Sequence, residues 1–257
     1  MKNASSEKQN VSRREFFTRT AAIGGGAACL TLGYPLAAGL FSEESTARGA
    51  VEYEYPWGYE KIDPEQAAEI AYEQWYKGLC SQATVSGVLV PLQESIGEPY
   101  TSLPLEAFHF GHGGVVGWGT ICGVLFGSGI ALSFVAGTDG ESILNELIYW
   151  YSDTALPTYT PLNPKSTIQN QTTSDSPLCH ISVGKWMKKE GVGLFTPERK
   201  ERCARVAAST AHKTVTLLNS WADGEFEAKH PFPTAMCDMA TQMNCVDCHK
   251  TEIPTTP

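Results

Sequence analysis

The placement of its cysteines constrains this chain more than any other feature. The 257 residues contain eight cysteines, and two of them stand in the segment Asn244-Cys245-Val246-Asp247-Cys248-His249 near the C-terminus. Two residues between the cysteines allow both sulfurs to form thioethers with one haem, and the adjacent histidine then lies beneath the iron. We therefore predict that Cys245 and Cys248 hold a haem c covalently and that His249 is the proximal iron ligand.

A C-x-x-C pair also occurs in disulfides, in redox-active motifs and as half of a zinc site. A zinc site needs a second ligand pair at short spacing, and a thioredoxin-like pair stands in a strand-helix unit. The sequence around Cys245 and Cys248 shows neither setting, so attachment of haem is the favoured interpretation.

Five cysteines lie between the N-terminal segment, which contains Cys29, and the haem motif. They are Cys80, Cys122, Cys179, Cys203 and Cys237. An odd number cannot be explained by disulfide pairing alone. The first four fall within or at the start of predicted helices, and four cysteines are the usual ligand set of an iron-sulfur cluster. Buried apolar thiols and a zinc site are the alternatives, and Cys237 is predicted to lie outside the set.

The N-terminus has the features of an export signal. Ser12-Arg13-Arg14-Glu15-Phe16-Phe17 precedes a glycine-rich apolar stretch over residues 21–41, which is typical of a twin-arginine signal peptide. We predict a signal over residues 1–50 and a periplasmic location. The stretch is also long enough for a retained membrane anchor. Twin-arginine passengers generally fold before export, which favours a second cofactor besides the haem.

The rest of the chain is predicted to be mainly α, with a compact helical domain at 51–222 and a haem-bearing tail at 223–257. Helix start signals stand at Asp63-Pro64-Glu65, Ser176-Pro177 and Thr196-Pro197-Glu198. The predicted helices cover 64–77, 79–96, 113–137 and 141–151, and two more begin at residues 176 and 196, the last ending near 222. Residues 152–176 are predicted to form a long loop.

The charge of the chain restricts its partners. The formal net charge is −9 at pH 7. Nucleic acids and anionic membranes select basic surfaces, so the composition argues against both unless the signal is retained as an anchor. A redox partner protein with a basic surface would complement this charge.

Four segments resemble an exported redox family named for its C…GCAxxG…C…C pattern. They are Cys80-Ser81-Gln82-Ala83, the glycine-rich run 113–123 with Cys122, then Cys179, and Glu201-Arg202-Cys203-Ala204. Three positions depart from the pattern: Ile121 replaces its glycine, Gly123 replaces its alanine, and Gly127 comes one place late. With the C-terminal haem motif added, the chain resembles the split-Soret cytochromes c within that family.

This resemblance implies a homodimer with two haems close together, each with two histidine ligands of which one comes from the other subunit. It also implies that Cys80, Cys122, Cys179 and Cys203 hold the cluster. Two histidine ligands leave no open axial position, which favours electron transfer over catalysis. We expect an electron carrier in anaerobic respiration, with a small periplasmic reductase as the alternative.

The second axial histidine is predicted from the tail. Residues 223–257 have few apolar residues at helical spacing, so the haem must dock either on the glycine-rich segment or on a second subunit. His230 is favoured because it lies on the tail. His112 and His109 follow because they flank the glycine-rich segment, and His212 comes last because its helix is expected to bury it.

Overall fold

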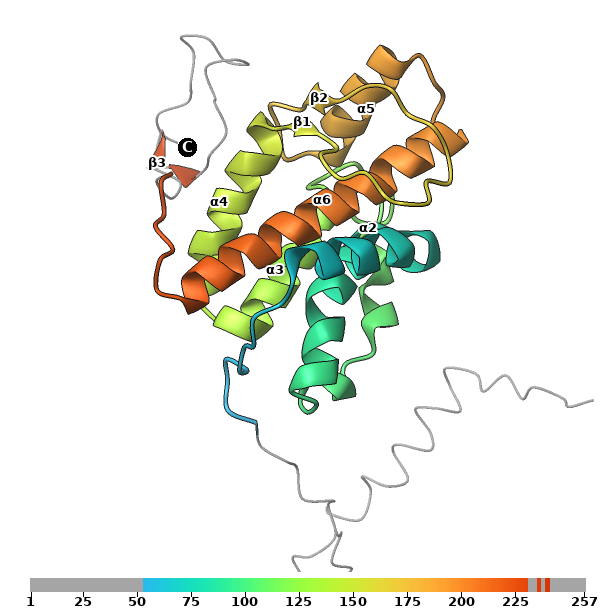
Figure 1. The fold of residues 1–257 in the computed structure, drawn as a ribbon. Helices are drawn as coiled ribbons and strands as arrows, with labels where there is room; N and C mark the ends of the chain where they lie inside the picture. Colours follow the sequence, from blue (N-terminus) through green and yellow to red (C-terminus); the bar gives the residue numbers. More distant parts are fainter. Residues whose placement is uncertain (1–52, 231–234, 237–238, 241–257) are drawn as a thin grey trace, which may run out of the picture. The chain divides into compact units, whose positions relative to one another are not determined.

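The computed structural model describes residues 53–230, 235–236 and 239–240, and these residues form a mainly helical fold (Figure 1). This agrees with the predicted fold class. The helices and strands are α2 (Pro64–Ser95), the 3-10 helices η2 (Tyr100–Ser102) and η3 (Leu105–Gly111), α3 (Gly123–Ala136), α4 (Asp139–Asp153), β1 (Ala155–Leu156), β2 (Thr172–Thr173), α5 (Cys179–Glu190), α6 (Pro197–Ala222), β3 (Ala235–Met236) and β4 (Met239–Ala240). The predicted signal over residues 1–50 and the predicted haem motif lie outside the described residues.

Helix α2 begins and bends where the sequence predicts. The side chain of Asp63 accepts a hydrogen bond from the backbone N–H of Glu65, and Pro64 occupies the first turn. Leu79 has φ 61° and ψ −160°, so the helix kinks at this residue, directly after Gly78. The kink places the following residue, Cys80, on the first turn of the second half of α2.

The glycine-rich segment is not the helix that we predicted over residues 113–137. Residues 113–120 are turns and loop, and α3 begins only at Gly123. Six residues of this segment have positive φ, namely Gly113, Gly114, Val115, Val116, Gly117 and Gly119. Glycine adopts such angles without steric cost, and a right-handed helix excludes them. The clustered glycines therefore build a folded loop ahead of α3.

The later helices follow the predictions more closely. Helix α6 starts at Pro197, with Thr196 as its cap accepting from the backbone N–H of Arg199. Helix α5 starts at Cys179, whereas Ser176-Pro177 predicted a start two residues earlier. Its cap position is Leu178, and the backbone N–H groups of Cys122 and Cys179 instead pair with the carbonyls of Pro177 and Thr120. This pairing ties the start of α5 to the start of α3.

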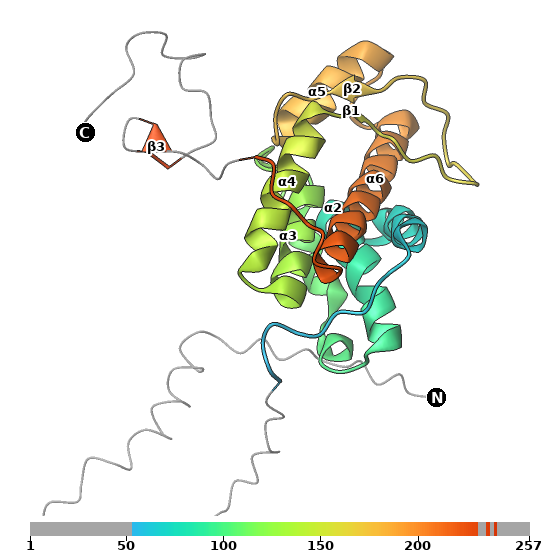
Figure 2. The same ribbon diagram turned by 60° about the vertical axis from the view of Figure 1, so that its left-hand side comes forward.

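The core is made by α2, α3, α4 and α6. Helix α2 packs along α6 and against α3, and α4 packs on α3 and α6. Helix α5 and the antiparallel β1–β2 pair lie at the end of this group where α4 ends (Figures 1 and 2). One of the two apolar clusters of the core contains all four of Cys80, Cys122, Cys179 and Cys203. Among the described helices, none has the length and apolar character needed to span a bilayer.

Candidate metal centre

Four cysteines that are 123 residues apart in sequence from first to last meet in one buried cluster. Cys80 follows the kink of α2, Cys122 caps α3, Cys179 is the first residue of α5, and Cys203 lies in the second turn of α6. Each is at most 9% exposed, and all four are free thiols. Four separate helices thus each contribute one sulfur.

Several hydrogen-bond donors point at these sulfurs. Trp75 Nε1 donates to Cys80 Sγ at 3.4 Å, and Arg202 Nη1 lies 3.9 Å from Cys203 Sγ. The backbone N–H groups of Gly113 and Val124 donate to Cys80 and Cys122, and the Tyr151 hydroxyl, which donates to Ser182 Oγ at 2.8 Å, also lowers the pKa of Cys122. Donors around a sulfur favour the thiolate, which is the form that binds metals.

The thiols influence one another electrostatically. A hydrogen bond from Cys179 lowers the pKa of Cys122 to about 6, whereas the same bond raises the pKa of Cys179. Burial, followed by Cys203 and Cys122, raises the pKa of Cys80 to about 12. Ionisation is thus favoured at Cys122 and opposed at Cys80 and Cys179, because like charges would be buried together. A bound cation would remove this restriction.

Within the described residues, no three Cys, His, Asp or Glu side chains gather tightly enough to hold one metal ion. In an iron-sulfur cluster the ligands reach different irons, so their sulfurs stand further apart than around one ion.

Two buried polar atoms beside the thiols lack partners. They are Ser81 Oγ, next to Cys80, and Arg202 Nε, next to Cys203. Both side chains are at most 1% exposed. A buried polar atom without a hydrogen bond is costly, so each of these atoms is suited to meet a further polar or charged group. Four free thiols and a buried arginine without a carboxylate partner fit an anionic metal cluster.

The glycines that depart from the family pattern allow α3 to approach α2. A Cβ added to Gly123 would lie 2.1 Å from the carbonyl oxygen of Gly111 and 2.7 Å from Cys80 Cβ. One added to Gly127 would lie 2.4 Å from the carbonyl oxygen of Ser81. Only glycine fits at either position, so both departures bring Cys122 close to Cys80.

An apolar cavity of about 730 Å³ opens beside the thiols. Cys80, Cys179 and Cys203 line it, together with the glycine-rich loop, and no Asp or Glu does. Arg199, Lys200 and Phe195 also line the cavity, and Phe195 is 84% exposed. Three of the four sulfurs thus lie next to a space that is accessible from outside.

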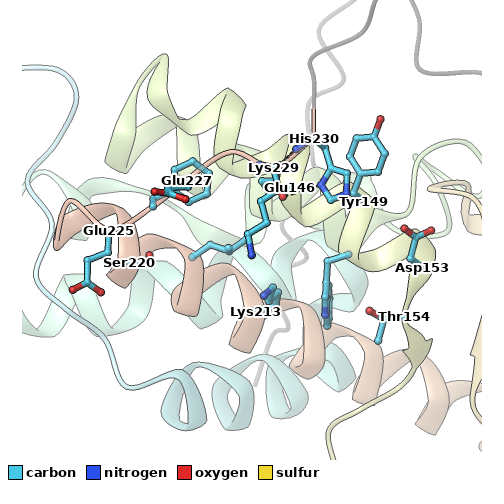
Figure 3. Close-up of a pocket in the computed structure, with 13 residues that line it drawn as sticks. Glu146, Tyr149, Asp153, Thr154, Lys213, Ser220, Glu225, Glu227, Lys229 and His230 are labelled. Carbon is cyan, nitrogen blue, oxygen red and sulfur yellow. Dashed lines mark hydrogen bonds and ion pairs between the residues drawn. The ribbon is translucent and has the colours of Figure 1, made fainter.

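His230 stands in a second pocket, of about 500 Å³, between α4 and the segment after α6. Its ring stacks on Tyr149 with centroids 4.0 Å apart, and its Nδ1 lies 2.9 Å from Glu146 Oε2 (Figure 3). Glu146 Oε1 accepts from the backbone N–H groups of Lys229 and His230. Although burial opposes it, these hydrogen bonds lower the pKa of Glu146 and keep it ionised.

The other candidate histidines are held less firmly. The His109 ring bonds the carbonyl of Gly78, and it contacts the His112 ring at a centroid distance of 5.0 Å. The expectation that helix α6 buries His212 is wrong, because its side chain is 39% exposed and contacts Glu65. Cys237, Cys245, Cys248 and His249 lie outside the described residues.

Comparisons with known proteins decide the family. The model described as "Putative redox-active protein (C_GCAxxG_C_C)" matches residues 79–217. The split-Soret cytochrome c of Desulfovibrio desulfuricans is 32% identical over 251 residues, which cover 95% of this chain and 88% of that protein. The chain belongs to the split-Soret cytochrome c family.

A solved structure from the split-Soret family supports the same assignment. It is the split-Soret cytochrome c from Desulfovibrio desulfuricans, described as containing a novel iron centre. It matches with a TM-score of 0.65 at 32% identity, covering 76% of this chain and 82% of that chain. The family predicted from the cysteine pattern and the haem motif is confirmed. The match to the redox-family model, over residues 79–217, includes all four buried cysteines.

Sequence reasoning missed two residues of these sites. Arg202 precedes Cys203 directly, and a basic residue beside a predicted ligand was the signal available for it. Glu146 lies 84 residues before His230, and nothing in the sequence links them. Only the packing of the segment after α6 on α4 in this structure places Glu146 beside the histidine.

Proposed function

We propose that the chain is an exported electron-transfer cytochrome with two redox centres. Cys245 and Cys248 hold one haem covalently, with His249 as its proximal ligand. Cys80, Cys122, Cys179 and Cys203 hold an iron-sulfur cluster. The observation that carries this proposal is the meeting of four buried, unpaired thiols in a relative of a cytochrome described with a novel iron centre.

When bound, the two groups would each supply a one-electron redox centre. The residues of the chain bind them, donate hydrogen bonds to the sulfurs and exclude water from the thiols. We propose that the protein acts outside the cytoplasmic membrane in anaerobic respiration, after export by the twin-arginine route. Its acidic surface complements a redox partner with a basic surface.

Analysis of the purified protein tests this proposal. We expect an iron-to-haem ratio above one, together with acid-labile sulfide and one haem for each chain. Protein from a host that matures c-type cytochromes, prepared without oxygen, is the appropriate sample. A ratio of one without sulfide would refute the cluster, and zinc in its place would support a structural metal instead.

We further propose that His230 is the second axial ligand, supplied to the haem of the partner subunit in a homodimer. An ionised carboxylate only accepts hydrogen bonds, so Glu146 fixes the proton of His230 on Nδ1. Nε2 then carries the free lone pair, as in metal-bound histidines oriented by a carboxylate. The stacked Tyr149 ring holds the imidazole plane in place.

Replacing His230 with alanine is expected to convert a low-spin, six-coordinate spectrum of the reduced protein into a high-spin one that binds carbon monoxide. The physical reason is the loss of a strong-field nitrogen ligand from the iron. His212→Ala is the matched control, and its spectrum should stay low-spin. An unchanged spectrum in His230→Ala would move the assignment to His112 or His109. Carbon monoxide binding by the unmodified protein would favour the reductase alternative.

A further inference from the structure

A charged arginine is buried beside the four cysteines. Arg202, in α6, is 1% exposed. Its Nη2 donates to Ser182 Oγ at 2.6 Å and lies 3.3 Å from the Ser182 carbonyl oxygen, and its Nη1 lies 3.9 Å from Cys203 Sγ. Its Nε has no partner. The guanidinium is therefore held by neutral oxygens and directed towards sulfur.

No carboxylate neutralises Arg202 among residues 53–230. The contrast with Arg205, one turn later in α6, is clear. Arg205 Nε donates to Glu201 Oε1 at 2.7 Å. Glu201 also accepts from Tyr72 and Tyr76, so its oxygens are already occupied. A buried charge without an opposite charge is strongly unfavourable, and Arg202 needs an anion from another source.

The groups that face the guanidinium include thiols of the proposed metal centre. Burial disfavours the charged form of Arg202, but Cys203, Tyr151 and Cys122 outweigh it and raise its pKa. Two of these three groups are proposed cluster ligands. Four thiolates around an iron-sulfur core leave a net negative charge. The guanidinium, which has no carboxylate partner among the described residues, lies beside Cys203, where part of that charge would be.

We propose that Arg202 is the charge-compensating residue of the cluster, favouring both its binding and its reduced state. This inference rests on the proposed function, since it requires a cluster at these cysteines. Reduction adds one negative charge in a region of low dielectric constant, where a fixed positive charge acts strongly. Removing the positive charge should therefore make reduction less favourable.

Neutral replacements of Arg202 test this role through the reduction potential of the cluster. In Arg202→Met and Arg202→Gln we expect reduction to become about tenfold less favourable, which corresponds to a fall of about 59 mV for one electron. Arg202→Lys keeps the charge, so its equilibrium constant for reduction of the cluster should stay within about threefold of that of the unmodified protein. Dithionite titrations of the full haem-containing protein, followed by electron paramagnetic resonance of the cluster, give these values.

Arg199→Met is the matched control, because Arg199 lies three residues earlier in α6 at the cavity lining. It removes the same charge from a position that solvent screens. The equilibrium constant for reduction of the cluster should therefore change by less than about threefold. A second readout is the rise in melting temperature on loading with iron and sulfide. This rise should be smaller in Arg202→Met than in the control.

The outcomes separate this inference from the proposed function. If the unmodified protein contains no cluster, the proposed function fails. The role of Arg202 is refuted if the protein contains a cluster and both neutral variants keep its reduction potential unchanged. It is also refuted if Arg202→Lys lowers the reduction potential as much as the neutral variants do. Should Arg202→Met not fold, Arg202→Gln decides, because its amide can keep the hydrogen bond to Ser182.

Discussion

A variant with alanine at both Cys245 and Cys248 is expected to contain no covalently attached haem. The two thioether bonds need both sulfurs, and no other C-x-x-C-H segment occurs in the chain to replace them. The loss should be complete. Mass spectrometry of the C-terminal peptide, and haem staining after denaturing electrophoresis, measure it in a host that matures c-type cytochromes.

Cys237→Ser is the control for this experiment, since it removes a cysteine eight positions before the motif. It should retain one haem for each chain. An unmodified C-terminal peptide in the wild-type protein, or a haem that survives in the double variant, would disprove the attachment site. The cluster should persist in the double variant if the helical body binds it independently of the haem.

Replacing Cys203 with alanine is expected to lower the iron-to-haem ratio to one and to abolish acid-labile sulfide. The proposed cluster needs four sulfurs, and the alanine variant leaves only three of the buried thiols in place. We expect a melting temperature lower by about 10 °C. This corresponds to a loss of roughly 3 kcal/mol of stability, since each kcal/mol shifts a domain of this size by about 2–4 °C. Calorimetry and iron, sulfide and haem analyses provide the measurements.

Chelation gives an independent check on the same prediction. Removing the metal from the unmodified protein should reproduce the low melting temperature of Cys203→Ala, and the variant itself should not respond to chelator. Cys237→Ser should behave as the unmodified protein does. If Cys203→Ala keeps its sulfide and its full iron content, the four-cysteine ligand set is wrong.

Helix boundaries were predictable wherever a local signal specifies them. Asp63 and Thr196 cap their helices with their own side chains, and this hydrogen bond depends only on residues two or three positions away. The start of α5 was misplaced because backbone pairing with the segment before α3 decides it. Apolar composition predicts a helix over the glycine-rich loop, because composition does not reveal the positive φ angles that exclude a helix there.

The cofactor sites divide in the same way. Haem attachment involves five consecutive residues whose spacing alone matches the chemistry, so the sequence by itself determined that prediction. The four cysteines of the proposed cluster are predictable from their pattern, but only the tertiary structure brings them together, through the kink at Leu79 and the close approach at Gly123. The unpaired charge of Arg202 and the carboxylate beneath His230 depend on contacts between separate helices. Long-range packing decides such contacts, and no local pattern encodes them.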